Sequence, residues 1–393
     1  MDAKTGKAFR ITALLAILIY CLFEHILRYY APRDFAMFEL VFVPQFRWMT
    51  FVLVCIWCVA LIFLTFHRND LWLIGLLLIA IFAYVTNYKR AAWDPSAITL
   101  LIAVVVGKGI PLLQCRKLTI VCLIALLAIA SFWHIESTSG YYHNPRWMGL
   151  WEDPNVYGML MGSGFMLSLC LMFKQHQSSR LRFILYLAAG MMGLGLLFSY
   201  SRGSWLGVVI SVLYLGKMKG WKFNWRFILL GIYAVAAIVW LFWNYDTEHW
   251  YLKRLDLSRP SSQNRVAAWK GAAQIIRDHP FGVGWNEAIQ IYGEHYSPPQ
   301  NGAGAITTNS YLMMGVQLGF PALLCYGVYL WNSFKPKITD SIQIACRAGA
   351  LVLLVAFWFD GGMFELPTAT LFWILLELGS IGNRKICEPH END

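Results

Sequence analysis

The stretch LWLIGLLLIAIFAYVT, residues 71–86, carries no charged side chain and approaches the roughly 20 apolar residues that a transmembrane helix needs. Similar runs recur through the 393 residues, of which 58% are hydrophobic and 14% charged. A soluble domain carries about 25% charged residues. The apolar residues form unbroken runs and are not confined to one helical face, which is typical of helices surrounded by lipid. The sequence therefore predicts an all-α polytopic integral membrane protein.

The same criterion predicts about twelve spans. They lie near residues 11–27, 50–66, 71–86, 97–114, 118–133, 156–173, 183–200, 204–215, 227–243, 309–331, 347–359 and 367–382. The chain then divides into helices with short loops (1–243), one long outer loop (244–308), and the last spans with a C-terminal tail (309–393). Most Lys and Arg residues of the short loops fall on one side if both termini are cytoplasmic. The net charge of +10 thus follows from topology and gives no indication of nucleic-acid binding.

The nine cysteines lie in predicted spans or on the predicted cytoplasmic side. This distribution predicts neither a disulfide framework nor a thiolate metal site. Cys55 and Cys58 have CxxC spacing but lie within a predicted span, where packing is the favoured interpretation.

The long outer loop contains NRVAAWKGAAQIIRDHPFGVGW, residues 264–285. Its first part predicts a helix with cap candidates Ser261, Ser262 and Asn264, and the turn HPFGVG ends it. Spacing by four is expected to place Arg265, Trp269 and Arg277 on one face. Arginine matches phosphate oxygens and an aromatic ring offers a surface to a sugar. An amphipathic helix on anionic lipid head groups explains the same pattern equally well.

Arg202, in FSYSRGSWLGVV (residues 198–209), stands at the outer boundary between two predicted spans. An ionisable residue at such a depth is a functional candidate. The alternative is an arginine that extends to the membrane surface without further function.

Two other polar stretches open predicted spans. In GLWEDPNVYGML (149–160), Asp153 or Asn155 is favoured as a helix cap, and the alternative is a metal-binding acidic pair of Glu152 and Asp153. Asn309 and Tyr311 belong to AITTNSYLMMGVQLGFPALL (305–324), which alone indicates only the start of a helix.

Together these four stretches resemble the bacterial O-antigen ligase and O-antigen polymerase superfamily. Its motifs match Gly149 to Asn155, Ser201 to Leu206, Arg265 with Trp269, His279-Pro280 to Gly284, and Asn309 to Gly319. Each motif is loose, but their order is specific. The resemblance covers about residues 149–325.

The resemblance implies a GT-C-like membrane enzyme that performs an inverting, metal-independent glycosyl transfer without a cofactor. The donor would be a glycan on undecaprenyl diphosphate at the periplasmic face of the bacterial inner membrane. Residues with implied catalytic roles are Arg202, Arg265 and His279. Implied donor contacts are Arg202, Arg265, Trp269, Arg277, Gly282 and Gly284, and implied acceptor or positioning residues are Thr308, Asn309, Tyr311, Asp153 and Asn155.

One residue departs from the family pattern. Ligases of this family carry a histidine before the asparagine of the last motif, and this chain has Thr308 there. A threonine does not accept a proton near neutral pH, so either the base is His279, His295 or a carboxylate such as Glu287, or the acceptor is activated differently.

The implied function is synthesis of a surface polysaccharide, an O-antigen of lipopolysaccharide or an exopolysaccharide, with other assembly proteins as partners. Polymerisation is slightly favoured over ligation to lipid A-core or another acceptor, since Thr308 weakens the match to ligases. A transporter or flippase of lipid-linked glycan is the alternative of another class. Such proteins usually show repeated halves and charges near the midplane, and here repeats are absent and polar residues gather on the outer side. A non-catalytic scaffold is the third hypothesis.

Overall fold

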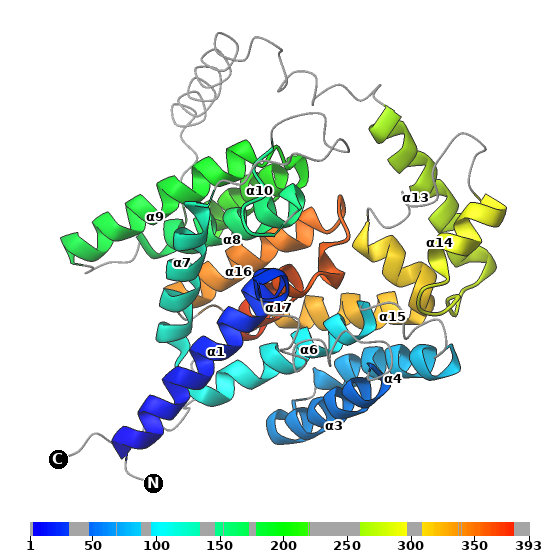
Figure 1. The fold of residues 1–393 in the computed structure, drawn as a ribbon, viewed down its shortest axis with the longest axis horizontal. Coiled ribbons are helices and arrows are strands. Elements are labelled where there is room, and N and C mark those ends of the chain that lie inside the picture. The colour runs from blue at the N-terminus through cyan, green and yellow to red at the C-terminus, as the bar shows by residue number, and fades with distance from the viewer. Residues whose placement is uncertain are drawn as a thin grey trace.

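The computed structural model describes residues 3–30, 47–67, 69–87, 96–133, 146–151, 153–172, 178–218, 220, 260–296, 309–336, 338 and 340–380. Within these ranges the regular elements are helices (Figure 1). The long helices are α1 (Ala3–Tyr30), α3 (Arg47–Thr65), α4 (Asp70–Thr86), α6 (Ser96–Gly109), α7 (Arg116–Ser131), α8 (Pro154–Met172), α9 (Ser179–Phe198), α10 (Arg202–Met218), α13 (Pro260–Asp278), α15 (Ser310–Phe334), α16 (Ser341–Ala356) and α17 (Leu366–Ser380). The short ones are η1 (Ile110–Leu113), α14 (Ala288–Ile291), η2 (Tyr292–Tyr296) and η4 (Gly362–Phe364).

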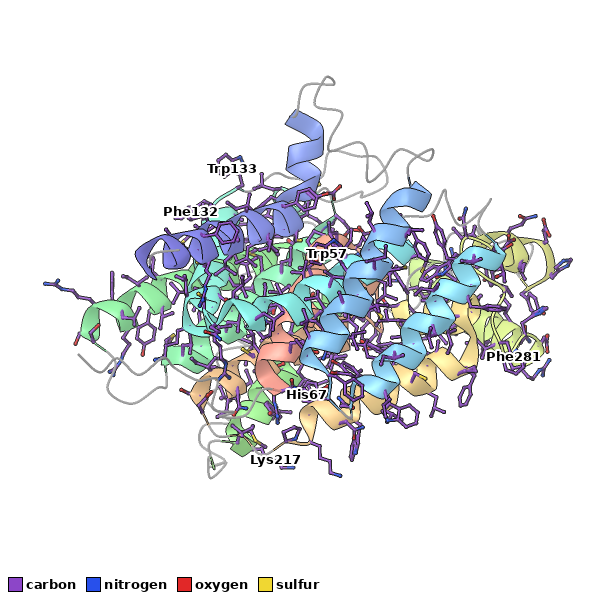
Figure 2. All side chains as sticks on the ribbon, turned by 90° about the horizontal axis from the view of Figure 1, so that it is seen from below. Trp57, His67, Phe132, Trp133, Lys217 and Phe281 are labelled. Carbon is purple, nitrogen blue, oxygen red and sulfur yellow. The ribbon has the colours of Figure 1, made fainter. Side chains whose placement is uncertain are left out.

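The predicted spans fall on these helices, apart from 227–243, which lies outside the described residues. By length and composition, four described helices could cross a membrane: Ser96–Leu113, Pro154–Met172, Ser179–Phe198 and Ser310–Phe334. Shorter apolar helices accompany them. Large apolar side chains such as Trp57 and Phe132 stand exposed on the outside (Figure 2). The all-helical membrane class is therefore supported, and the count of twelve stays a prediction.

Helices α8, α16 and α17 form the centre of the bundle, and α9 packs against α8 from outside (Figure 1). Small residues allow the central helices to approach closely. A Cβ atom on Gly207 of α10 would stand 2.6 Å from the carbonyl oxygen of Val352 in α16. Close backbone contact of this kind is the usual way in which membrane helices associate.

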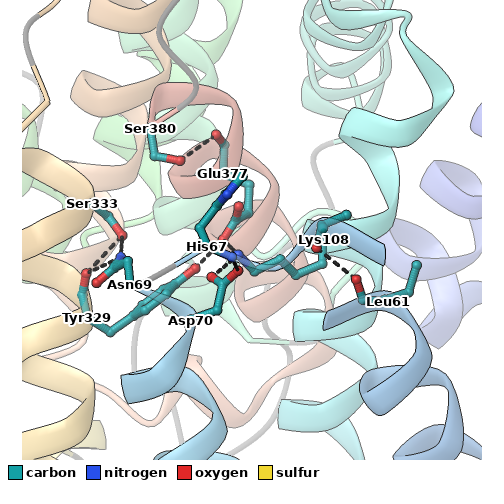
Figure 3. Close-up of polar contacts among 10 residues, drawn as sticks. Leu61, His67, Asn69, Asp70, Lys108, Tyr329, Ser333, Glu377 and Ser380 are labelled. Carbon is teal, nitrogen blue, oxygen red and sulfur yellow. Dashed lines mark hydrogen bonds and ion pairs between the residues drawn. The ribbon is translucent and has the colours of Figure 1, made fainter. Parts of the chain in front are cut away.

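A buried cluster of charges joins four helices (Figure 3). Lys108 Nζ in α6 lies 2.6 Å from Asp70 Oδ1 in α4 and 3.1 Å from Glu377 Oε1 in α17. Tyr329 Oη of α15 donates a hydrogen bond to Glu377. Each buried charge thus has a partner, which is the condition for keeping ions in an apolar interior.

Helix α13 begins at Pro260, so the predicted caps Ser261, Ser262 and Asn264 are wrong: all three lie inside the helix. Proline is favoured in the first helical turn because its missing N–H would have no intrahelical partner there. The buried face of α13, with Ala268, Ala272 and Ile275, packs in a small second core with Tyr292 and Val316.

The turn after α13 is docked into a break in α15. Gly319 has φ +84°, and around it Val283 N donates to Val316 O (2.8 Å) while Phe320 N donates to Pro280 O (2.8 Å). A Cβ atom on Gly282 would stand 2.5 Å from Gln317 O. The turn therefore fixes the C-terminal end of α13 to the bundle.

Candidate active site

The turn between α16 and η4 is the place where the polar motifs meet. Asp360, in this turn, accepts a hydrogen bond on Oδ2 from Asn155 Nδ2 of α8 (2.8 Å). Its backbone oxygen accepts from Ser310 N (3.2 Å) and Ser310 Oγ (2.7 Å), at the start of α15. The first turns of two helices are therefore fixed to the same carboxylate-bearing turn.

Asp153 and Asn155 act together at the start of α8. Asp153 Oδ1 accepts from the backbone N of Asn155 (2.6 Å) and of Val156 (3.4 Å), so Asp153 caps α8, whereas Asn155 lies inside the helix. Asn155 Oδ1 accepts from Arg146 Nη2 (2.8 Å), and Arg146 Nε donates to Ser199 O (2.8 Å). Asn155 thus bridges a buried guanidinium and the Asp360 carboxylate.

Arg202 is the first residue of α10. The chain reaches it through a tight turn, with Tyr200 at φ +52° and Ser201 Oγ 2.9 Å from Ser204 Oγ. The positive end of the helix dipole disfavours a cation there unless an anion is nearby. Gly203 brings α10 against the 357–365 turn, because a Cβ atom on it would stand 3.0 Å from Phe359 Cβ.

Arg265 and Trp269 approach the same turn from α13. The rings of Trp269 and Phe359 lie 6.3 Å apart between centroids. Trp269 Nε1 is buried and finds no hydrogen-bond acceptor among the described residues. Phe359 therefore contacts both the start of α10 and the N-terminal half of α13. Convergence of the Arg202 and Arg265 side chains on one ligand stays a prediction.

The charges around Asp360 change its acidity. The pKa of the Asp360 carboxyl is raised to about 7, chiefly by desolvation and also by the nearby carboxylates of Asp153 and Glu365. The Arg265 guanidinium and the Asn155 hydrogen bond act in the opposite direction. Asp360 is thus a carboxyl group that can hold or release a proton near neutral pH.

Several predicted site residues lie elsewhere. Arg277 is 76% exposed and its Nε forms an ion pair with Asp278 (3.0 Å). At the rise of an α-helix, Arg277 lies about 18 Å along α13 from Arg265. The exposed His279, which directly follows the helix, lies about 21 Å from Arg265 on the same estimate. The structure does not bring either residue together with the turn at 357–365.

Other predicted positions have structural contacts. Gly282 meets α15, and a Cβ atom on Gly284 would stand 2.4 Å from Asn87 Nδ2, so packing explains both glycines. Asn309 Oδ1 caps α15 by accepting from Tyr311 N and Leu312 N (3.0 Å each), while its buried Nδ2 has no partner among the described residues. Tyr311 Oη donates to Leu354 O (2.6 Å).

Thr308 lies outside the described residues. Of the bases considered from the sequence, buried Glu287 accepts from Asn87 Nδ2 (3.4 Å), and exposed His295 lies near Glu294 in η2. Neither is among the groups that change the pKa of Asp360.

Sequence reasoning missed Arg146 and Asp360. The only local signal for Asp360 is a carboxylate in FWFDGG between two apolar runs, on the side where the other motifs gather. In the described ranges, no group of three or more His, Cys, Asp and Glu side chains could hold a metal ion, and the expected metal independence stays a prediction.

Residues 187–327 match the family model described as O-antigen ligase. The match contains Arg202, Arg265, Asn309 and the docked HPFGVG turn, and it excludes Asp153, Asn155 and Asp360. No curated protein matches the chain. The family is glycosyltransferase-like and implies a membrane enzyme acting on lipid-linked glycans. The match over residues 187–327 supports a relationship of this part of the chain to the O-antigen ligase-related superfamily.

Proposed function

We propose that the chain is a glycosyltransferase of the periplasmic face, which transfers glycan from an undecaprenyl-diphosphate-linked donor during synthesis of a surface polysaccharide. One observation carries the proposal. Elements bearing two arginines, Arg202 and Arg265, meet at one turn that also holds a carboxyl group poised near neutral pH. Glycosyl transfer from a diphosphate requires cations for the leaving group and a proton acceptor for the incoming hydroxyl.

In this proposal the two arginines bind the diphosphate of the donor substrate. As the bond from the sugar to the diphosphate breaks, negative charge grows on the phosphate oxygens, and fixed guanidinium groups stabilise it. The positive end of the α10 dipole adds to the field at Arg202. Trp269, with a buried indole N–H that no described residue satisfies, supplies an aromatic face and a donor for a sugar. A single displacement at the anomeric carbon inverts its configuration and needs no metal.

Polymerase is slightly favoured over ligase because Thr308 replaces the histidine of the ligases. In a polymerase the acceptor is a second lipid-linked glycan, and in a ligase it is lipid A-core or another molecule. The transporter alternative is weaker because a flippase has no use for a proton acceptor at its outer end. The intramembrane charges Lys108, Asp70 and Glu377 pair with one another within the helix core.

The test is reconstitution of the purified chain in vesicles with an undecaprenyl-diphosphate-linked oligosaccharide as sole substrate. A ladder of longer lipid-linked glycans, read on a gel, indicates a polymerase. Transfer that appears only after lipid A-core or another acceptor is added indicates a ligase. Folded protein that gives neither product, but moves the donor between leaflets, contradicts the proposal.

Arg265→Ala is expected to lower transfer by about 100- to 1,000-fold, the usual cost of losing one group that stabilises transition-state charge. Lys270→Ala is the matched control, because it removes one positive charge from an exposed position of the same helix. Equal losses in the two variants would indicate a general charge effect and would argue against a specific diphosphate contact.

A further inference from the structure

Glycosyl transfer needs a group that receives the acceptor proton, and the threonine at position 308 does not supply one near neutral pH. We propose that Asp360 is the base that takes the proton from the acceptor hydroxyl, an assignment that rests on the proposed glycosyl transfer. None of the four motifs contains this residue, and it lies outside the matched residues 187–327.

The geometry leaves one carboxylate oxygen available. Asn155 Nδ2 donates a hydrogen bond to Asp360 Oδ2. In the part of the chain that the structure describes, no donor forms a hydrogen bond with Oδ1. Asp360 as a residue is partly exposed, in a turn at the surface of the bundle. Ser310 and Met363 fix the backbone: Ser310 Oγ donates to Asp360 O and accepts from Met363 N (3.2 Å). The base is therefore held on a rigid turn, as positioning of a reacting group requires.

The charged groups around Asp360 act on its pKa in opposite directions. Asp153 of the α8 cap and Glu365 after η4 raise its pKa, while Arg265 of α13 lowers it. Arg146 stands behind Asn155, whose oxygen it binds. A general base works best when its pKa lies near the working pH, because it is then both ionised and basic enough.

The neighbouring carboxylates are less suited to this role. Asp153 Oδ1 already accepts two backbone N–H groups at the start of α8, so this oxygen is occupied by the helix cap. Glu365 is exposed to solvent. Burial raises the pKa of the Asp360 carboxyl, and Asp360 is held by the Asn155 hydrogen bond.

The reaction balances with these groups. The acceptor oxygen forms its bond to the anomeric carbon of the donor sugar, and its proton passes to Asp360 Oδ1. The bond from that carbon to the phosphate oxygen breaks, and its electron pair leaves on undecaprenyl diphosphate beside Arg202 and Arg265. Asp360 then releases the proton to water.

The experiment measures kcat/KM for transfer against pH in the reconstituted full chain, together with equilibrium binding of undecaprenyl diphosphate to the same vesicles. The wild-type rate is expected to rise with pH through the region near 7, since only the ionised carboxylate accepts a proton. Asp360→Asn is expected to lose about 100-fold or more in rate, and the rise with pH, while it keeps lipid diphosphate binding. Asparagine still accepts the hydrogen bond from Asn155.

The variant Glu365→Gln tests whether the protonation of Asp360 sets the pH dependence of the rate. Removing this negative charge lowers the pKa of Asp360, so the rise in rate is expected at lower pH with the plateau kept. If the rise of kcat/KM with pH stays at the same pH in Glu365→Gln, the assignment of Asp360 as the base is wrong. The same holds if Asp360→Asn keeps the wild-type rate and pH profile, and in both cases the proposed function still stands. A wild-type chain that transfers glycan to no acceptor overturns the proposed function as well.

Discussion

The two ends of α13 look alike in sequence and differ in the structure. Each carries an arginine, Arg265 near the start and Arg277 at the end. Arg265 acts on the Asp360 carboxyl, whereas Arg277 is exposed and paired with its neighbour Asp278. The N-terminal half faces the candidate site, and the C-terminal end is bound into the break of α15.

The two ends of α13 therefore have different roles, one in positioning the helix and the other in the reaction. The glycine turn holds the helix at a fixed angle to the bundle, and the opposite end then presents Arg265 and Trp269 to the turn at 357–365. A motif shared by a family therefore need not consist of ligand contacts alone. Substitutions at the two ends should change different quantities: stability at the docked end, and transfer at the other.

The largest effect is expected from Gly282→Ala at the docked end. Gly282 has φ +84°, and the added Cβ would stand 2.5 Å from Gln317 O. Backbone strain and overpacking together cost about 2–6 kcal/mol of stability. Thermal unfolding in detergent measures the loss. Gly327→Ala in α15 is the control, because no atom lies within 4 Å of its Cβ and alanine favours the helix. Similar melting temperatures for the two variants would contradict the docking role.

Arg265→Lys should give an intermediate effect at the other end. Lysine keeps the charge but loses the planar fork that binds two phosphate oxygens at once. We expect transfer to fall by about 10-fold, less than in Arg265→Ala, with an unchanged melting temperature. Steady-state rates at saturating acceptor measure it. A lysine variant as inactive as the alanine variant would show that geometry, and not charge, governs the contact.

The sequence predicted most of the helices, because long apolar runs have few other stable forms in lipid. Boundaries were less certain. The span predicted at 347–359 is α16, Ser341–Ala356, which starts at a capping box formed by Asp340 and Gln343. Arg347, the first residue of the predicted span, lies in the second turn of α16. The structure buries it, with Nη1 donating to Phe334 O and Nε to Gly379 O (2.8 and 2.9 Å).

The candidate site was predictable only in part, for a related reason. Motifs reveal residues that are close in sequence, and Arg202 and Arg265 were found in this way. Asp360 is 205 positions from its hydrogen-bond partner Asn155, and its pKa depends on burial that no local pattern encodes. The same limitation hid Asp70 as the partner of Lys108.

The smallest effect is expected from His279→Gln, which tests the role that the resemblance assigned to this residue. His279 is exposed at the docked end, and the regular helix separates it from Arg265 by about 21 Å, so its imidazole does not reach an acceptor held at Asp360. Exposed substitutions of this kind change stability by about 0.5 kcal/mol or less. We expect the rate and its rise with pH near 7 to be kept. If His279→Gln abolished that rise while Asp360→Asn kept it, the base would lie at the docked end, and the division of α13 into an anchoring and a reacting end would be wrong.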